Sequence, residues 1–265
     1  MPILSTTASC RPMPAGQGWT LPFLELDGPS QMALDRWLLE QSVTSGTKSP
    51  VLRFYGWKGP WLSLGRHQVA TPPHWQALAD AGVIKLVRRP SGGGAVLHSG
   101  GLTYALIWPG APRQRREAYR QTSTWLIDSF QSLGHTLEPG RSAATARLQN
   151  CFAGASAADL VDREPHNSGA HNSEAHKRIG SAQYWLHGHL LQHGEIVLQP
   201  PADLWETLFD STPPAPLEAL TQQELITALT QTLQNRWPEV HWHGQTLGDD
   251  AWQQVKSASE NYRLA

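Results

Sequence analysis

The sequence has little cysteine, almost no net charge and no long apolar run, and each shortage excludes a class of protein. The 265 residues hold 2 cysteines, too few for a disulfide framework, so we expect a reduced, cytoplasmic compartment. Lys and Arg total 21 against 22 for Asp and Glu, without the basic excess of a nucleic-acid-binding protein. No apolar stretch approaches the ~20 residues of a membrane-spanning helix. The N-terminus also lacks the basic start and apolar core of a signal peptide.

The remaining composition predicts one large domain behind a loose arm. Residues 1–18 are rich in Pro, Ser, Thr and Gly and predict a flexible N-terminal arm, whereas 19–265 carry the periodic patterns of a folded domain. Apolar spacing predicts helices over 30–43 (with Ser30 as its cap), 74–81, 116–134 and most of the chain from about 203. Strands are predicted over 19–26, 51–57, 61–67, 83–89, 102–108 and 189–198. Because strands and helices mix without a βαβ rhythm, the expected fold class is α+β.

The sequence also predicts the structure of two segments that connect the expected elements. The strand-like runs 51–57 and 61–67 flank Lys-Gly-Pro, which predicts a β-hairpin. Residues 162–176 are polar, lack periodicity and carry no large aliphatic or aromatic side chain, which predicts a loop insertion. This insertion is either a lid that orders on substrate binding or an inert segment.

The stretch RRPSGGGAVLH, residues 88–98, holds three consecutive glycines. Gly92–Gly94 permit backbone angles that side chains forbid, and bare N–H groups in such a turn can bind a phosphate, a carboxylate or a developing oxyanion. The alternative is a flexible connection between two strands. A nucleotide P-loop would continue with Gly-Lys-Ser/Thr, and a dinucleotide motif would open a helix, but Ala-Val-Leu follows here. The loop therefore lies between strands and matches neither nucleotide motif.

Five stretches in order resemble the biotin/lipoate protein ligase superfamily, which includes ATP-dependent lipoate–protein ligases and octanoyl or lipoyl transferases. They are RRPSGGGAVLH, MALDRWLLEQ (32–41), LRFYGWKGPWLSLGRHQ (52–68), KRIGSAQYWLHGHLLQHGEIVL (177–198) and SENYRLA at the C-terminus. The resemblance spans most of residues 30–265. It implies a class II synthetase-like catalytic domain with a mixed, largely antiparallel sheet and flanking helices. It also implies that substrate is bound by Arg89, Ser91, Gly92, Gly93, Gly94, Ala95, His98, Gly180, Ser181, Ala182 and Gln183.

Two residues carry the chemistry that the resemblance implies. Lys177 stands three residues before Gly180, the spacing of the family's essential lysine, and its charge would stabilise an oxyanion or a thiolate. Cys151, in NCF, would by itself more often be a small buried hydrophobic residue. In one transferase branch of the family, however, this stretch carries the nucleophile that holds the acyl group as a thioester.

Three functions stay open at this stage. The first is an acyltransferase without a cofactor, moving octanoyl or lipoyl from acyl carrier protein through Cys151 to a lysine of a lipoyl domain. The acceptor would belong to a 2-oxoacid dehydrogenase or be the glycine-cleavage carrier protein. The second is a lipoate–protein ligase that uses ATP and Mg. It is weakened because Ser99 stands where ligases commonly have Asp, although Gly94 is ligase-like. The third is a non-catalytic binder of acylated carrier domains. We expect a monomer with no nucleic-acid or membrane partner.

Two clusters are less specific. The histidines at 166, 171 and 176 recur every five residues, a spacing that gathers no ligands on one face of a helix or strand, so no metal site is expected. His98 and His193 belong to the family's motifs and are expected to shape the pocket. The arginines at 113, 115, 116 and 120 form either a solvated face or a docking surface for acidic carrier domains.

Overall fold

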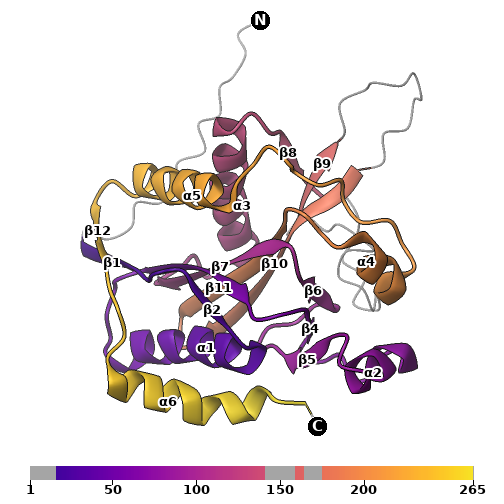
Figure 1. Cartoon of the computed structure of the whole chain (residues 1–265). Coiled ribbons are helices and arrows are strands. Elements are labelled where there is room, and N and C mark those ends of the chain that lie inside the picture. The colour runs from indigo at the N-terminus through magenta and orange to yellow at the C-terminus, as the bar shows by residue number, and fades with distance from the viewer. Residues whose placement is uncertain (1–15, 141–158, 164–174, 265) are drawn as a thin grey trace, which may run out of the picture.

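The computed structural model of the chain describes residues 16–140, 159–163 and 175–264. A large sheet lies between two layers of helices, and a second, small sheet lies beside it (Figure 1). The large sheet is formed by β1 (Gly16–Thr20), β2 (Leu24–Leu26), β3 (Val51–Trp57), β7 (Gly101–Pro109), β8 (Leu137–Pro139), β9 (Leu160–Arg163), β10 (Ala175–Leu186), β11 (His189–Val197) and β12 (Val240–Gly244).

The strand order in the large sheet is β12-β1-β3-β7-β11-β10-β9-β8, with β2 paired to β3. Neighbours from β3 to β8 run antiparallel. Strand β1 runs parallel to both β12 and β3, and β2 runs parallel to β3. The sheet is therefore mixed and largely antiparallel, which confirms the expected fold class.

The small sheet has the order β5-β4-β6, formed by β4 (Trp61–Leu64), β5 (Lys85–Arg88) and β6 (Val96–His98). The predicted hairpin is wrong, because β3 pairs with β7 in the large sheet while β4 pairs with β5 and β6. The chain changes sheets at the Lys-Gly-Pro turn. Strand β3 is buried along almost its whole length and pairs with strands distant in sequence, which a local turn pattern does not encode.

In the described part of the chain, six α-helices cover the sheets: α1 (Gly28–Thr44), α2 (Pro73–Asp80), α3 (Arg115–Ser132), α4 (Ala202–Phe209), α5 (Gln222–Arg236) and α6 (Asp249–Ser259). In Figure 1, α3 and α5 lie on one face of the large sheet and α1 and α6 on the other. The predicted helices are confirmed, although β12 interrupts the helical C-terminal part. The cap of α1 is Asp27 rather than Ser30, because the Asp27 carboxylate accepts from the Ser30 N–H at 2.9 Å. None of the helices in the described ranges is long and apolar enough to cross a membrane.

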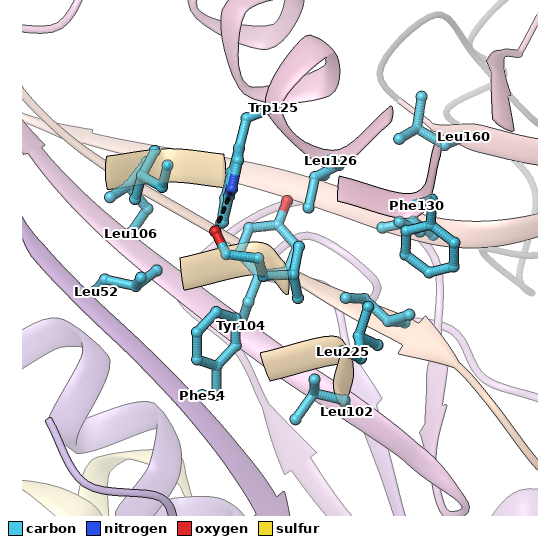
Figure 2. Close-up of a cluster of buried hydrophobic side chains, with 14 of the residues drawn as sticks. Leu52, Phe54, Leu102, Tyr104, Leu106, Trp125, Leu126, Phe130, Leu160 and Leu225 are labelled. Atoms are coloured by element: carbon cyan, nitrogen blue, oxygen red, sulfur yellow. Dashed lines mark hydrogen bonds between the residues drawn. The ribbon is translucent and has the colours of Figure 1, made fainter. Parts of the chain in front are cut away.

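Strand β7 shows why the sheet is covered on both faces. Leu102, Tyr104 and Leu106 enter the core under α3 and α5, whereas Ala105 and Ile107 enter the core under α1. Figure 2 shows the first of these cores, in which the α3 residue Trp125 also donates from its indole to a backbone carbonyl of α5. The central strands therefore need no polar face, and they position side chains on either side of the sheet.

Two predicted boundaries need correction. Residues 162–163 belong to β9 and 175–176 to β10, so both ends of the predicted insertion pair as strands, and 164–174 lie outside the described residues. At the N-terminus, residues 16–18 of the predicted arm are part of β1, where their backbone pairs with β12.

Candidate active site

The glycine loop connects β5 to β6 and is held closely on one side. Gly93 has a φ of +98°, a conformation that favours glycine. A Cβ built at Gly65, just after β4, would lie 1.9 Å from the carbonyl oxygen of Gly93, whereas one at Gly92 would meet no atom within 4 Å. The loop thus packs against the end of β4 and is open at Gly92.

The Arg89 side chain binds backbone carbonyl groups of the glycine loop. The residue is 6% exposed, and its guanidinium donates to the carbonyl oxygens of Gly92 at 2.8 Å and Gly94 at 2.6 Å. The C=O and N–H of a trans peptide point in opposite directions, so the N–H groups of Gly93 and Ala95 point away from the guanidinium. Gly93 is exposed, so its N–H is suited to an anion or a developing oxyanion, whereas Ala95 is buried and lies in a β-bridge.

Gly65→Ala should destabilise the protein, because the added Cβ would overlap the Gly93 carbonyl. Forced overpacking of this kind costs about 1–3 kcal/mol. The matched control is Gly244→Ala in β12, where a Cβ would meet no atom within 4 Å. Urea unfolding of both variants tests the contact, and equal losses of stability in the two would contradict it.

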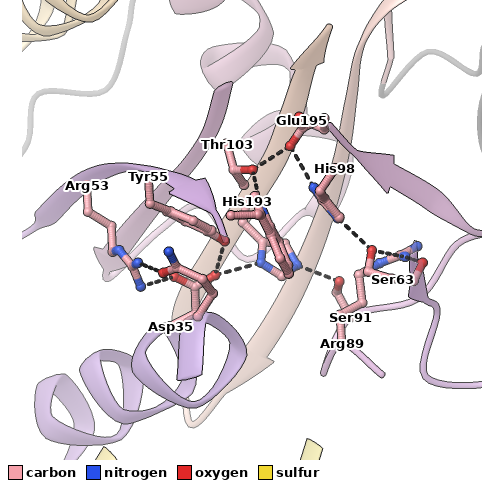
Figure 3. Close-up of polar contacts among 12 residues, drawn as sticks. Asp35, Arg53, Tyr55, Ser63, Arg89, Ser91, His98, Thr103, His193 and Glu195 are labelled. Atoms are coloured by element: carbon pink, nitrogen blue, oxygen red, sulfur yellow. Dashed lines mark hydrogen bonds and ion pairs between the residues drawn. The ribbon is translucent and has the colours of Figure 1, made fainter. Parts of the chain in front are cut away.

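Three buried side chains join the glycine loop to β11 and α1 (Figure 3). The Ser91 hydroxyl lies 2.6 Å from His193 Nε2, and His193 Nδ1 lies 2.9 Å from the Asp35 carboxylate. Asp35 also pairs with Arg53 at 3.0 Å and accepts from the Tyr55 hydroxyl at 2.9 Å. Burial, reinforced by the nearby Asp35 carboxylate, raises the pKa of Tyr55 well above its ordinary value, so this hydroxyl remains a donor.

A second buried chain is centred on His98. Its Nδ1 lies 2.7 Å from the Glu195 carboxylate and its Nε2 lies 2.8 Å from the Ser63 hydroxyl. Glu195 also accepts from the Thr103 hydroxyl. The Trp57 ring stacks on His98 with centroids 3.9 Å apart. A carboxylate only accepts, so Nδ1 of His98 carries the proton, and burial lowers the pKa of His98 and keeps the ring neutral.

The neutral state of His98 predicts a pH dependence of stability. The unfolded chain has the ordinary histidine pKa of 6.5, whereas the folded pKa is lower. Between these two values the unfolded state binds more protons, so the free energy of unfolding should fall as the pH falls. Urea unfolding at pH values above and below the interval between the two pKa values should show this decrease in the free energy of unfolding. In His98→Gln the decrease should be smaller. Identical slopes in the wild type and the variant would contradict the assignment.

A cavity of about 350 Å³ opens beside His98. Its lining includes Trp57 and the three acidic residues Glu25, Glu195 and Glu218. Carboxylates in this number make the cavity unfavourable for phosphate groups. The glycine loop, rather than this cavity, therefore stays the candidate for anion binding.

Lys177 is buried in β10 beside a carboxylate. It is 4% exposed, and its Nζ lies 2.8 Å from Asp159, which is 6% exposed. The pairing of β9 with β10 shifts register between Lys177 and Ile179. Such bulges re-aim side chains and are common next to active sites. The ion pair holds a positive charge at a defined place, where it can stabilise an oxyanion or a thiolate.

Residues 180–183 of β10 are divided between the two faces of the sheet. Ala182 lies opposite His193, so it and Gly180 share the face of the buried chains described above. The Ser181 hydroxyl instead bonds a tyrosine in the core under α3, and Gln183 shares that face. The structure thus separates Ser181 and Gln183 from Gly180 and Ala182. The substrate-binding roles of all four stay predictions.

Cys151 lies outside the described residues, as do His166 and His171. His176, the third of the regularly spaced histidines, pairs in β10 opposite Asp162. Within the described ranges, no group of three or more His, Cys, Asp and Glu side chains could hold a metal ion.

Sequence reasoning missed several residues of this site. The sequence could have identified Asp35, because it is a lone carboxylate on a buried helix face between Met32 and Leu38. Asp159 and Gly65 had no such signal, since their importance comes from partners that only the fold brings close.

Known proteins resemble this chain in sequence and in fold. The family model "Lipoyl protein ligase A/B catalytic domain" matches residues 27–222. The octanoyltransferase LipM of Anoxybacillus flavithermus is 37% identical over 191 residues, covering 67% of this chain and 64% of that protein. The LipM of Geobacillus kaustophilus is 36% identical, with the same two coverages. The chain therefore aligns with slightly less than two thirds of the length of these relatives.

Two solved structures share the fold. Lipoate-protein ligase A bound with ATP superimposes with a TM-score of 0.72 at 17% identity, covering 92% of this chain and 94% of the other. A bipartite lipoate protein ligase from Thermoplasma acidophilum gives 0.68 at 18% identity, covering 92% of each chain. At these identities the likeness concerns the fold alone.

Proposed function

The chain belongs to the lipoyl protein ligase A/B catalytic-domain family, and from this premise we propose that it is an acyltransferase of protein lipoylation. It would move an octanoyl (or lipoyl) group from acyl carrier protein to a lysine of a lipoyl domain, through a thioester on Cys151. The observation that carries the proposal is the identity of 37% to an octanoyltransferase over 191 residues. The family model, which matches residues 27–222, includes the glycine loop and Lys177.

The reaction divides into two exchanges. In the first, the Cys151 thiolate attacks the thioester carbonyl of the acyl carrier protein, the bond to the carrier's sulfur breaks, and the acyl group remains on Cys151. In the second, a lysine amine attacks the new thioester, an amide forms and the Cys151 sulfur leaves. Thioester exchange is nearly isoenergetic, so the covalent intermediate splits the transfer into two easier steps.

Both exchanges pass through a tetrahedral oxyanion. The N–H of Gly93, which is exposed and directed away from Arg89, is suited to bind it. The Lys177 ammonium would add positive charge at the oxyanion and favour the thiolate form of Cys151. Arg89 would keep the loop in shape rather than contact the acyl group, because its guanidinium is occupied by loop carbonyls.

The partners follow from this chemistry. The donor would be acyl carrier protein, and the acceptor a lipoyl domain of a 2-oxoacid dehydrogenase or the glycine-cleavage carrier protein. The transfer needs no cofactor, since the acyl group arrives as a thioester. We propose that the protein acts as a cytoplasmic monomer, without nucleic-acid or membrane partners.

The test uses octanoyl-acyl carrier protein in the absence of ATP, followed by intact mass. We expect the wild type to gain one octanoyl group and Cys151→Ala to gain none. Cys10→Ala is the matched control, because it removes the other cysteine of the chain and should keep the adduct. No adduct together with ATP-dependent use of free lipoate would make the protein a ligase. Activity in neither assay would favour a non-catalytic binding module.

A further inference from the structure

The second exchange needs a group that takes a proton from the attacking amine. The lysine nitrogen must lose a proton as its bond to the acyl carbon forms, or the intermediate reverts to the thioester. Lys177 is a poor acceptor, because its Nζ is engaged with the Asp159 carboxylate and an ammonium only donates. Among the described residues next to the glycine loop, a buried hydroxyl or histidine nitrogen is a better candidate, because each has a lone pair that can accept a proton.

Asp35, His193 and Ser91 have the geometry of a proton relay. Asp35 accepts from His193 Nδ1 at 2.9 Å, and because a carboxylate only accepts, that nitrogen carries a proton. His193 Nε2 is then free to accept from the Ser91 hydroxyl at 2.6 Å. Asp35 is itself held by Arg53 and Tyr55. The ring thus has one tautomer and one orientation, as in a Ser-His-Asp arrangement.

Ser91 is better placed for this task than Ser63, the serine that contacts His98 in the second buried chain. Ser63 accepts a bond from Arg89 at 3.1 Å while it contacts His98, so its oxygen is occupied by a cation. Among the contacts of the described residues, the Ser91 hydroxyl has His193 as its one partner. Ser91 also directly precedes Gly92, the open position of the loop.

We propose that Ser91 accepts the amine proton in the second exchange, with His193 and Asp35 as the residues that position and relay it. This inference rests on the proposed function. As the C–N bond forms, the amine proton passes to Ser91 Oγ and the proton of Ser91 passes to His193 Nε2. The imidazolium is stabilised by Asp35. As the C–S bond breaks, the same relay runs backward and delivers a proton to the Cys151 sulfur, so amine and thioester give amide and thiol.

The test separates the two exchanges in Ser91→Ala and His193→Gln. Each variant is loaded with octanoyl-acyl carrier protein, and adduct formation is followed by intact mass. The isolated acyl-enzyme is then mixed with a lipoyl domain or with hydroxylamine, which attacks thioesters without a catalytic base. We expect loading within about threefold of the wild type, lysine transfer lowered by about 10²-fold, and unchanged transfer to hydroxylamine.

Ser42→Ala is the matched control. Ser42 is 3% exposed, against 1% for Ser91, and its hydroxyl lies 2.9 Å from Nδ1 of His189, so it too contacts a histidine of β11. This variant should keep wild-type rates in both exchanges.

Three outcomes would overturn the inference. The first is lysine transfer at the wild-type rate in Ser91→Ala. The second is an equal slowing of lysine and hydroxylamine transfer, which would indicate a structural role. The third is failure of both variants to load, which would assign these residues to the first exchange or to loop structure. A wild type that forms no adduct would instead overturn the proposed function, and the inference with it.

Discussion

Lys177→Met is expected to slow acyl transfer strongly and to destabilise the fold at the same time. Loss of one group that stabilises an oxyanion lowers a rate by about 10²–10³-fold. The same substitution leaves the buried Asp159 carboxylate without the ammonium 2.8 Å away. Breaking a buried pair from one side costs about 3–5 kcal/mol. The two losses have different origins, so a second substitution should separate them.

The double variant Lys177→Met/Asp159→Asn makes this separation. Neutralising the carboxylate should recover most of the lost stability, measured as the urea midpoint, because the buried charge that lost its ammonium partner is gone. Adduct formation from octanoyl-acyl carrier protein should stay as low as in the single variant. Lys256→Met, at an exposed position of α6, is the control and should change neither quantity. Recovery of transfer in the double variant would mean that Lys177 acts only through the fold.

The sequence predicted those parts of the fold that depend on local pattern. Helix α3 and strand β11 appear within a few residues of the predicted ranges, because apolar periodicity reports which side of an element is buried. The glycine loop lies between two strands, as its flanking residues indicated. The predicted hairpin from β3 to β4 was wrong because strand pairing does not depend on local pattern. Contacts between strands that are distant in sequence determine the pairing, and the residues of a turn do not encode those contacts.

The candidate site was predictable as a set of motifs but not as a set of contacts. Ser91 and His193 stand 102 positions apart, and His193 and Asp35 stand 158 positions apart. Only the stacking of α1, β11 and the small sheet brings them together. The division of residues 180–183 between two faces is likewise a property of β10 as a strand. The sequence motif assigned all of residues 180–183 to substrate binding and did not show this alternation.

Asp35→Ala is expected to destabilise the fold about as strongly as Lys177→Met. The substitution removes the carboxylate that pairs with Arg53, accepts from Tyr55 and orients His193. Arg53 is 1% exposed, so its charge would stay buried without this partner, at a cost of about 3–5 kcal/mol. The measurement is the free energy of unfolding in urea.

Glu40→Ala on the same helix is the control for Asp35→Ala. Its carboxylate pairs with Arg36 at 2.6 Å, but its side chain is 46% exposed, and exposed pairs contribute at most about 1 kcal/mol. Asp35→Asn adds the chemical test, because it keeps the shape of the side chain but removes the charge and one acceptor oxygen. If Asp35 serves only the fold, Asp35→Asn should slow lysine and hydroxylamine transfer alike. If it also orients His193, only the lysine step should slow, since the orientation of the ring matters solely to the group that takes the amine proton.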